Sequence, residues 1–394
     1  MKESLFNYRF EYENQKYIFN TNNNGLIQIN NDIFTEEERE YLRVNRFWVD
    51  DNEDEIALLE REINHNIQKR QKELELTIAL TNYCNFSCVY CYQNKNEKLM
   101  TTEVANMIIE KIDRILNDNI FEGINIHYFG GEPLLNIPVL IYLDENIKKI
   151  TAKIGIVYKA FLTTNGSMLS KELLQKVKFS SIQLTFDGLE KTHDRLRVSD
   201  HFHFKEEIEL IENIMNFSQA KVLLRTNICK ENKDEIIALH KYIFEKFGNE
   251  RIEINPNRTI KYHQDDSFEM LSVQEYAEVA YQIKLLWSEQ KGKFELPVPR
   301  STPCKFPYGN AYAISPEGYC TFCSGSMDQE KKYFFDVDIE NKKMFSVRKE
   351  CKKCNILPLC LGGCIIQYNL RAGACTYEKY ELKNILISYI KHIS

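Results

Sequence analysis

The feature that most constrains this chain is a short cysteine motif. Cys84, Cys88 and Cys91 lie within ALTNYCNFSCVYCYQNK at C-x3-C-x2-C spacing, and no other cysteine lies within a hundred residues on either side. This spacing lets one loop direct three thiolates at a single metal centre. Structural zinc ions and electron-carrying iron–sulfur clusters normally take four protein ligands, so three thiolates leave one metal position open for chemistry. A zinc site completed by a distant histidine is the competing interpretation.

Composition indicates a globular protein whose cysteines bind metal. The chain has 394 residues, enough for two or three domains, with 43% hydrophobic and 27% charged residues. Its start has no continuous apolar segment typical of a secretory signal, and no run of 18 apolar residues predicts a membrane span. Twelve cysteines without an export signal favour metal ligands in a reducing, cytoplasmic location over disulfides. The net charge of −6 gives no indication of a nucleic-acid partner.

Residues 1–72 are predicted to form a separate N-terminal module. Aromatic and polar residues alternate over 6–12, as in a half-buried strand, and the turn sequence NNNG occupies 22–25, which together predict a β-meander. A helix is predicted from about 51 to 70, with Ile56, Leu59, Ile63 and Ile67 on one face. Its acidic start and basic end suit the helix dipole.

Residues 73–295 alternate candidate strands with helical patterns. Six strands are expected at 76–81, 124–131, 155–164, 181–188, 221–228 and 251–257. Helices are predicted between them, for instance over 104–116 and 234–247, and a further helix over 272–290. Repeated βα units predict parallel strands with right-handed crossovers, so the fold class is α/β, with a partial or full barrel or an open sheet. In each of these, ligands bind at the carboxyl ends of the strands, where the cysteine motif falls.

The last part, residues 296–394, carries a second set of cysteines and a predicted terminal helix over 379–393. The set is Cys304, Cys320, Cys323, Cys351, Cys354, Cys360, Cys364 and Cys375. The block ECKKCNILPLCLGGC alone would suit a zinc ion with four cysteine ligands. Eight thiols exceed the need of one zinc ion and fit two sites of four ligands. Cys229 lies outside both sets and is predicted to be a buried free thiol.

Together the two cysteine patterns resemble the radical SAM superfamily, specifically members with a C-terminal SPASM domain. One is the triad with an aromatic residue, Tyr90, before its last cysteine, and the other is the seven-cysteine SPASM order that Cys304 through Cys375 match. The resemblance covers about residues 75–380. It implies a partial (β/α)6 radical SAM barrel over 73–295, preceded by the module at 1–72 and followed by a SPASM domain over 296–394.

The resemblance implies three [4Fe–4S] clusters and S-adenosylmethionine (SAM) as cofactors. The triad would hold three irons of the first cluster, whose fourth iron binds the amino and carboxylate groups of SAM. One electron then yields methionine and a 5′-deoxyadenosyl radical that abstracts hydrogen from the substrate. The family assigns two auxiliary clusters to the remaining cysteines, one to Cys351, Cys354, Cys360 and Cys375, the other to Cys304, Cys323 and Cys364. The fourth ligand of the latter is either Cys320 or an open iron position.

Family motifs at the predicted strand ends imply the SAM-binding residues. Gly130, Gly131 and Glu132 match the GGE motif that holds the SAM amino group. Glycines allow close backbone approach, and a carboxylate can accept from an ammonium. Thr164 and Asn165 begin a match to the family's TNG.

Thr185 precedes Asp187 where many members have S-x-D-G. Arg225 is costly to bury unpaired, so we expect it to pair either with the SAM carboxylate or with a carboxylate on a neighbouring strand. His193, Asp194 and Arg197 resemble the family's H-D-x-x-R segment, for which capping and surface pairing is an equally good explanation.

Members of this type mostly modify peptides, so the hypothesis is a maturase of a ribosomally made precursor peptide. It would install a thioether or carbon–carbon crosslink or epimerise a residue, with a flavodoxin or ferredoxin as electron donor. The module at 1–72 either captures the precursor at a strand edge or simply caps the barrel. The pattern identifies no catalytic residue.

Two alternatives remain. Formylglycine formation, as in anaerobic sulfatase-maturating members, is disfavoured because Ser324 stands where those enzymes carry an aspartate base. A zinc-binding scaffold or an iron–sulfur electron-transfer protein is the non-enzymatic alternative.

Overall fold

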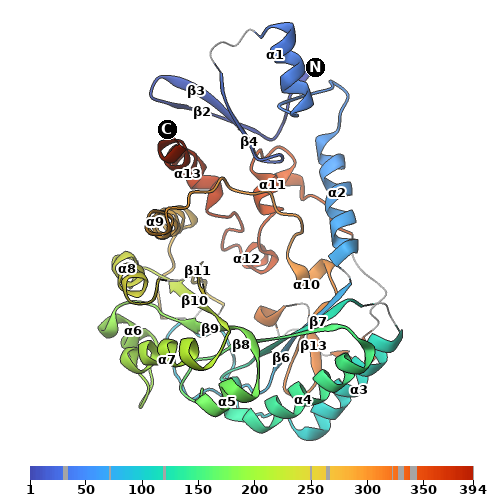
Figure 1. The fold of residues 1–394 in the computed structure, drawn as a ribbon, viewed down its shortest axis with the longest axis vertical. Helices are drawn as coiled ribbons and strands as arrows, with labels where there is room; N and C mark the ends of the chain where they lie inside the picture. Colours follow the sequence, from blue (N-terminus) through green and yellow to red (C-terminus); the bar gives the residue numbers. More distant parts are fainter. Residues whose placement is uncertain are drawn as a thin grey trace. The chain divides into compact units, whose positions relative to one another are not determined.

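The computed structural model describes residues 1–29, 34–70, 72–118, 121–248, 251–262, 267–321, 323–326, 332–337 and 344–393 (Figure 1). The chain divides into two compact units. One contains Met1–Lys69, Ser272–Cys304 and Lys343–Ser394, and the other contains Arg70–Leu271 and Lys305–Lys342. Within the described ranges, no helix has the length and apolar content needed to cross a bilayer.

The larger unit is built on a nine-stranded sheet whose first six strands are parallel and follow sequence order. These are β6 (Glu73–Ala79), β7 (Gly123–Phe129), β8 (Val157–Thr163), β9 (Phe179–Thr185), β10 (Lys221–Ile228) and β11 (Ile252–Arg258). The sheet continues beyond β6 through β12 (Ala311–Ile314), which is parallel to β6, and the antiparallel β13 (Tyr319–Thr321) and β14 (Lys332–Tyr333). Among the described strands β11 and β14 are its edges, so the predicted α/β barrel is confirmed as an open, partial one.

Helices connect the parallel strands and pack on the sheet (Figure 1). They are α3 (Thr102–Asp118), α4 (Ile137–Ile154), α5 (Lys171–Lys176), α6 (Glu190–Leu196), α7 (Phe204–Phe217) and α8 (Ile236–Phe247). Short helical segments complete the unit: α10 (Lys305–Tyr308), η1 (Pro133–Asn136), η2 (Ser324–Ser326) and η3 (Phe334–Asp336). In α3, the buried residues Ala105, Ile108, Ile112 and Ile115 recur every three or four positions, which gives the helix one apolar face.

Strand register brings the predicted motifs together at the carboxyl ends of the parallel strands of this sheet. Ala79 at the end of β6 pairs with Phe129 at the end of β7, and Thr185 at the end of β9 pairs with Arg225 in β10. Because neighbouring parallel strands end side by side, the loops that follow them also lie side by side. The cysteine motif, the GGE segment and the TNG turn are three such loops.

The smaller unit contains the predicted β-meander, which the structure confirms. β2 (Asn7–Tyr12), β3 (Gln15–Asn20) and β4 (Gly25–Ile29) form an antiparallel sheet, and β1 (Lys2–Glu3) pairs with β5 (Trp48–Val49). Its helices are α1 (Glu36–Val44), α2 (Glu55–Arg70), α9 (Val273–Lys291), α11 (Leu357–Cys360), α12 (Ile365–Asn369) and α13 (Glu378–Ile393), with a short η4 (Lys349–Cys351). The sequence did not predict α1, and α2 begins later than expected.

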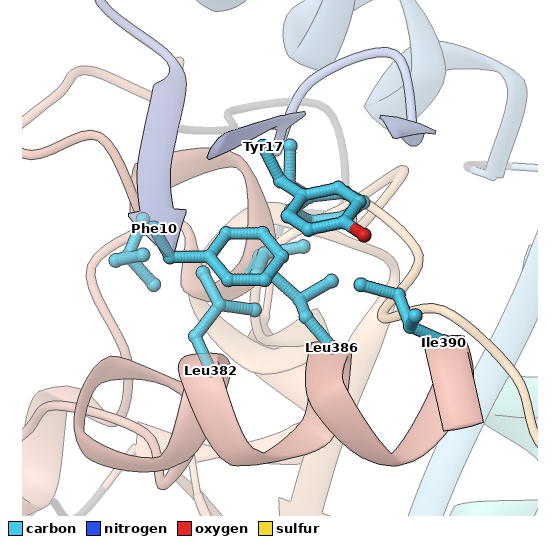
Figure 2. Close-up of a cluster of buried hydrophobic side chains, with 8 residues drawn as sticks. Phe10, Tyr17, Leu382, Leu386 and Ile390 are labelled. Carbon is cyan, nitrogen blue, oxygen red and sulfur yellow. The ribbon is translucent and has the colours of Figure 1, made fainter. Parts of the chain in front are cut away.

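One hydrophobic cluster joins the meander to the C-terminal region. Its buried members are Phe10, Tyr17, Phe19, Ile356, Leu359, Leu382, Leu386 and Ile390 (Figure 2). The rings of Phe10 and Tyr17 stack with centroids 5.2 Å apart. A second cluster, of Ile18, Ile29, Leu42 and Phe47, connects the sheet to α1 and its following loop. The N-terminal strands therefore share a core with α11 and α13 instead of standing apart.

This shared core predicts a stability effect at Leu386, whose side chain is fully buried in it. Leu386→Ala should lower the free energy of unfolding by about 2–5 kcal/mol, because it removes buried methyl groups and leaves a cavity. The matched control is Lys383→Ala on the exposed side of α13. Denaturant unfolding followed by circular dichroism measures both, and equal midpoints for the two variants would contradict the described packing.

Candidate functional site

The cysteine triad occupies the loop that follows β6. Thr81 begins the loop by bridging to Leu99, and its hydroxyl accepts the Tyr83 N–H at 2.8 Å. All three thiols are half-buried. Burial is the main reason that the pKa of Cys88 is raised to about 11; Arg197 lowers it, and Cys91 and Cys84 raise it. The three thiols thus influence one another electrostatically, and their binding of one metal centre stays a prediction.

A zinc ion and a [4Fe–4S] cluster differ in how closely they bring their thiolate ligands together. Within the described ranges, no three His, Cys, Asp or Glu side chains are arranged to hold one metal ion. Zinc needs ligands that converge on one point at about 2.0–2.3 Å. A [4Fe–4S] cluster binds each thiolate through a different iron, so its cysteines stay further apart. The Phe86 N–H also donates to Cys84 Sγ at 3.4 Å, which suits a sulfur that carries negative charge.

The glycines of the GGE segment pack directly on the backbone before the first cysteine. Gly131 N–H donates to Thr81 O at 2.8 Å, and Glu132 N–H donates to Tyr83 O at 2.9 Å. A Cβ atom on Gly130 would lie 2.4 Å from Thr81 O, and one on Gly131 would lie 2.1 Å from Tyr83 O. Only glycine permits this approach. The close backbone contact that these glycines make is with the cysteine loop, and their contact with SAM stays a prediction.

Glu132 is buried, and its carboxylate accepts three hydrogen bonds from the protein. The donors are Thr164 Oγ1 at 2.7 Å, Asn165 N–H at 2.6 Å and Leu134 N–H at 3.0 Å. Burial raises the pKa of Glu132 to about 6 against the opposing effect of these donors. The carboxylate thus joins the end of β7 to the end of β8. Its contact with the SAM amino group stays a prediction.

The TNG turn also contacts the cysteine loop. Asn165 Nδ2 donates to Asn85 Oδ1 at 2.8 Å and lies 3.8 Å from Cys84 Sγ. Asn85 Nδ2 in turn donates to Ser167 Oγ at 2.9 Å. Three predicted segments from separate strand ends are therefore brought together around the first cysteine.

Residues at the ends of β9 and β10 reach the loop through one carboxylate. Arg225 Nε donates to Asn227 Oδ1 at 2.9 Å, and Asn227 N–H donates to Asp187 Oδ1 at 2.7 Å. The other oxygen of Asp187 accepts from the Tyr90 hydroxyl. The structure places Thr185 beside Arg225 in register, and the contacts of both with SAM stay predictions.

The H-D-x-x-R segment divides between two roles. Asp194 Oδ1 accepts the Phe204 N–H at the start of α7, at 2.9 Å, which confirms the capping interpretation for this residue. His193 is buried with Nε2 3.1 Å from Glu207 Oε2, and Arg197 is buried as well. Surface pairing therefore does not describe these two side chains.

An aromatic pair that the sequence did not predict lies between two of the cysteine sites. Tyr92 follows Cys91 and stacks on Tyr262, with ring centroids 4.8 Å apart and planes at 29°. Tyr262 Oη lies 3.0 Å from where a Cβ on Gly325 would stand, and Gly325 N–H donates to Cys323 Sγ at 3.3 Å. Burial raises the pKa of Tyr92, and Cys91 and Cys323 raise it further. Tyr92 itself was visible in the motif, but nothing local marked Tyr262 as its partner.

Four of the C-terminal cysteines gather in the smaller unit. Cys354 N–H donates to Cys351 O at 3.0 Å. The pKa of Cys360 is raised to about 11, mainly by burial and in part by Cys354 and Cys351. Lys379 Nζ donates to Cys375 Sγ at 3.5 Å, and Cys375 and Cys354 both raise the pKa of this lysine. The four cysteines therefore lie in one unit and affect the charge of shared neighbours, and their assignment to one auxiliary cluster stays a prediction.

Glycines shape this second cysteine site as they shape the first. Gly362 N–H donates to Cys360 Sγ at 3.4 Å. A Cβ on Gly363 would lie 1.8 Å from Ala374 O, so the glycine turn packs directly against the residue before Cys375. Backbone donors to sulfur and close packing of the loop fit a group that carries negative charge.

The remaining cysteines are described within their own units. Cys304 and Cys364 are exposed in the smaller unit, whereas Cys320 is buried in β13 of the larger unit and Cys323 is half-buried after it. Their grouping as a second auxiliary site stays a prediction. Cys229 is buried, as expected, and its thiol donates to Asn232 Oδ1 at 3.6 Å.

A comparison with known protein families identifies the domain that contains the triad loop. Residues 78–243 match the family model of the radical SAM superfamily. They run from β6 into α8 and include the cysteine triad, the GGE segment and the TNG turn. Residues 78–243 form a radical SAM domain. Radical SAM chemistry requires a [4Fe–4S] cluster and SAM, and the described triad fits the cluster.

Two relatives align with this chain over different lengths. The radical SAM cyclopropyl synthase TigE of Paramaledivibacter caminithermalis is 23% identical over 372 residues, which cover 83% of this chain and 76% of that protein. The GTP 3′,8-cyclase of Helicobacter pylori is 31% identical over 186 residues, or 45% of this chain and 53% of that protein. The chain thus spans about half the length of the cyclase that it matches.

Two solved structures share the fold around the radical SAM domain. anSMEcpe with bound AdoMet has a TM-score of 0.62 at 18% identity, over 80% of this chain and 99% of that one. SuiB of Streptococcus suis bound to precursor peptide SuiA has a TM-score of 0.55 at 16% identity, over 96% of this chain and 98% of that one. At these identities the likeness shows the fold alone.

The packing of the radical SAM domain predicts that Gly130→Ala loses iron. The new methyl group would collide with Thr81 O and displace the cysteine loop. Gly155→Ala is the matched control, because Gly155 also has a positive φ but nothing lies within 4 Å of its Cβ position. Iron analysis after anaerobic reconstitution should show a loss of about one cluster, four irons, only for Gly130→Ala. Equal iron in both variants would contradict the described contact.

The four-cysteine site predicts a separate loss. Cys354→Ala should remove about four irons per chain, because it deletes one ligand of the auxiliary cluster predicted in the smaller unit. Cys229→Ala removes a buried thiol outside both sets and should leave the iron content unchanged. If Cys354→Ala retained the iron content of the unmodified protein, the proposed grouping would be wrong.

Proposed function

We propose that this chain is a radical SAM maturase that modifies a ribosomally made precursor peptide. The gathering of Cys351, Cys354, Cys360 and Cys375 outside the radical SAM domain carries the proposal, because auxiliary clusters in a SPASM domain are typical of members that act on peptides. TigE, aligned over most of this chain, is a radical SAM cyclopropyl synthase. SuiB and anSMEcpe have been solved with a precursor peptide and with the Cp18Cys peptide, respectively.

In this proposal Cys84, Cys88 and Cys91 hold the SAM-binding cluster. When bound, that cluster supplies the electron that cleaves SAM to methionine and a 5′-deoxyadenosyl radical. The residues of the protein position the cysteine loop. Glu132 fixes the GGE segment on the TNG turn, and Asp187 holds Tyr90 from the side of β9 and β10. SAM then binds along Gly130, Gly131, Glu132, Thr164, Asn165, Thr185 and Arg225.

The organisation that follows from this function has three parts. Residues 1–72 recognise the precursor, residues 73–295 form the radical SAM barrel, and residues 296–394 form a SPASM domain with two auxiliary clusters. The second of these clusters takes Cys304, Cys323 and Cys364, with Cys320 or an open iron position as its fourth ligand. A flavodoxin or ferredoxin supplies the electrons.

The sheet β2–β3–β4 offers a way to hold an extended peptide. β3 is its central strand, so among the described strands β2 and β4 each have one unpaired edge. Such an edge can bind a peptide through main-chain hydrogen bonds. Phe10 and Tyr17 anchor the sheet on α13, so a peptide bound there would be attached to the unit that carries the four gathered cysteines.

The test is mass spectrometry of a candidate precursor peptide incubated with reduced enzyme and SAM. A crosslink gives a product lighter by two hydrogens, and epimerisation in D2O leaves the bonding unchanged but incorporates deuterium. The variant with Cys84→Ala, Cys88→Ala and Cys91→Ala should give neither product nor 5′-deoxyadenosine. An unmodified peptide without deuterium uptake would count against both versions of the proposal.

Formylglycine formation is the second candidate, favoured by the likeness in fold to anSMEcpe, which has been solved with AdoMet and the Cp18Cys peptide. Ser324, which begins η2, takes the position of the expected aspartate base and weighs against it. Loss of sulfur from a cysteine peptide in the same assay would establish this activity in place of crosslinking. Cyclisation of GTP would instead point to the cyclase relatives.

A further inference from the structure

Arg197 is a buried cation in the radical SAM domain to which the proposed function has so far given no role. It follows α6, where its N–H donates to His193 O at 2.8 Å, and its side chain is buried with 6% of the residue exposed. Burying a guanidinium is costly unless charges or hydrogen bonds compensate it. The groups around it therefore indicate what it does.

The backbone on both sides of Arg197 is hydrogen-bonded to the cysteine loop. Ser87 N–H donates to Val198 O at 2.8 Å, and Val89 N–H donates to Leu196 O at 3.0 Å. The two bonds flank Cys88 on the loop and Arg197 on the facing segment. The middle ligand of the triad and the buried cation are thus held opposite each other.

The side chain of Arg197 points toward the same loop. Its guanidinium carbon lies 5.4 Å from the centroid of the Phe86 ring. An arginine keeps its proton at physiological pH. The buried guanidinium is therefore a fixed positive charge beside the triad loop.

Two buried carboxylates interact electrostatically with the guanidinium. Glu207 and Asp187 both raise the pKa of Arg197. Glu207 also faces His193, and Asp187 accepts from Tyr90 and from Asn227 N–H. Among the described residues, Arg197 Nε has no hydrogen-bond partner although it is buried. A buried donor in this position fits an anionic group bound by the triad.

We propose that Arg197 is a positioning residue for the SAM-binding cluster. Its backbone neighbours clamp the loop around Cys88, and its guanidinium supplies a fixed positive charge that favours the reduced, more negative cluster. Three thiolates on a [4Fe–4S]2+ core carry a net charge of about −1, and reduction makes it about −2, so a nearby cation stabilises the reduced state more. The inference deepens the proposed function of the same site and rests on it.

The test compares Arg197→Gln and Arg197→Lys with Arg195→Gln. Arg195 is the matched control, because it lies two positions earlier in α6 with an exposed side chain. Each protein is reconstituted anaerobically, its iron is counted, and the EPR signal that changes on SAM addition is titrated against potential. Arg197→Gln should shift the midpoint potential of that signal to more negative values. Arg197→Lys should restore part of the shift, and Arg195→Gln should match the unmodified protein.

The outcomes separate this inference from the proposed function. An unchanged midpoint in Arg197→Gln with full iron, or an equal shift in Arg195→Gln, would overturn the role of Arg197. If Arg197→Gln takes up too little iron to titrate, the iron content of Arg197→Lys is the deciding measurement. More iron in Arg197→Lys than in Arg197→Gln supports the role of the positive charge, and an equal loss in both variants contradicts it. If no EPR signal of the unmodified protein changes when SAM is added, the radical SAM function itself is refuted.

Discussion

The close approach of the GGE segment to the residues before Cys84 is the contact on which the site depends. No side chain fits at Gly130 or Gly131 because the backbone of Thr81 and Tyr83 occupies that space. The same segment carries Glu132, whose buried carboxylate collects donors from the end of β8. The glycines therefore fix one loop directly and a second through the carboxylate. Thiolates held in this way are placed for a cluster before it binds.

A buried network of charged and polar side chains also contacts the cysteine loop. Asp187 accepts from the Tyr90 hydroxyl, and the backbone on both sides of Arg197 is hydrogen-bonded to the loop around Cys88. Buried ionic groups are unfavourable unless they compensate one another, so this network adds little to stability and is better explained by the site that it surrounds. The four cysteines of the smaller unit also have donors beside their sulfur atoms. A lysine contacts Cys375, and a backbone N–H contacts Cys360.

The elements and motifs that depend on local sequence could be predicted. Periodicity predicted the meander and the six parallel strands, and short spacings predicted the triad, the GGE segment and the TNG turn. The partners of Glu132 could not be predicted, because they depend on how β7 and β8 align. The pairing of Tyr92 with Tyr262 could not be predicted either, because the two residues follow β6 and β11, which are far apart in the sequence. In α2, Ile56 was expected on the buried face and is only half-buried, whereas Glu55 is buried because Ser4 Oγ and Leu5 N–H donate to its carboxylate.

The most direct test of the account is EPR and iron analysis of the reconstituted, reduced protein with and without SAM. The account predicts about twelve irons per chain, as three [4Fe–4S] clusters require, and one cluster signal that changes when SAM is added. Stoichiometric zinc in place of iron, or iron–sulfur signals that do not respond to SAM, would contradict it.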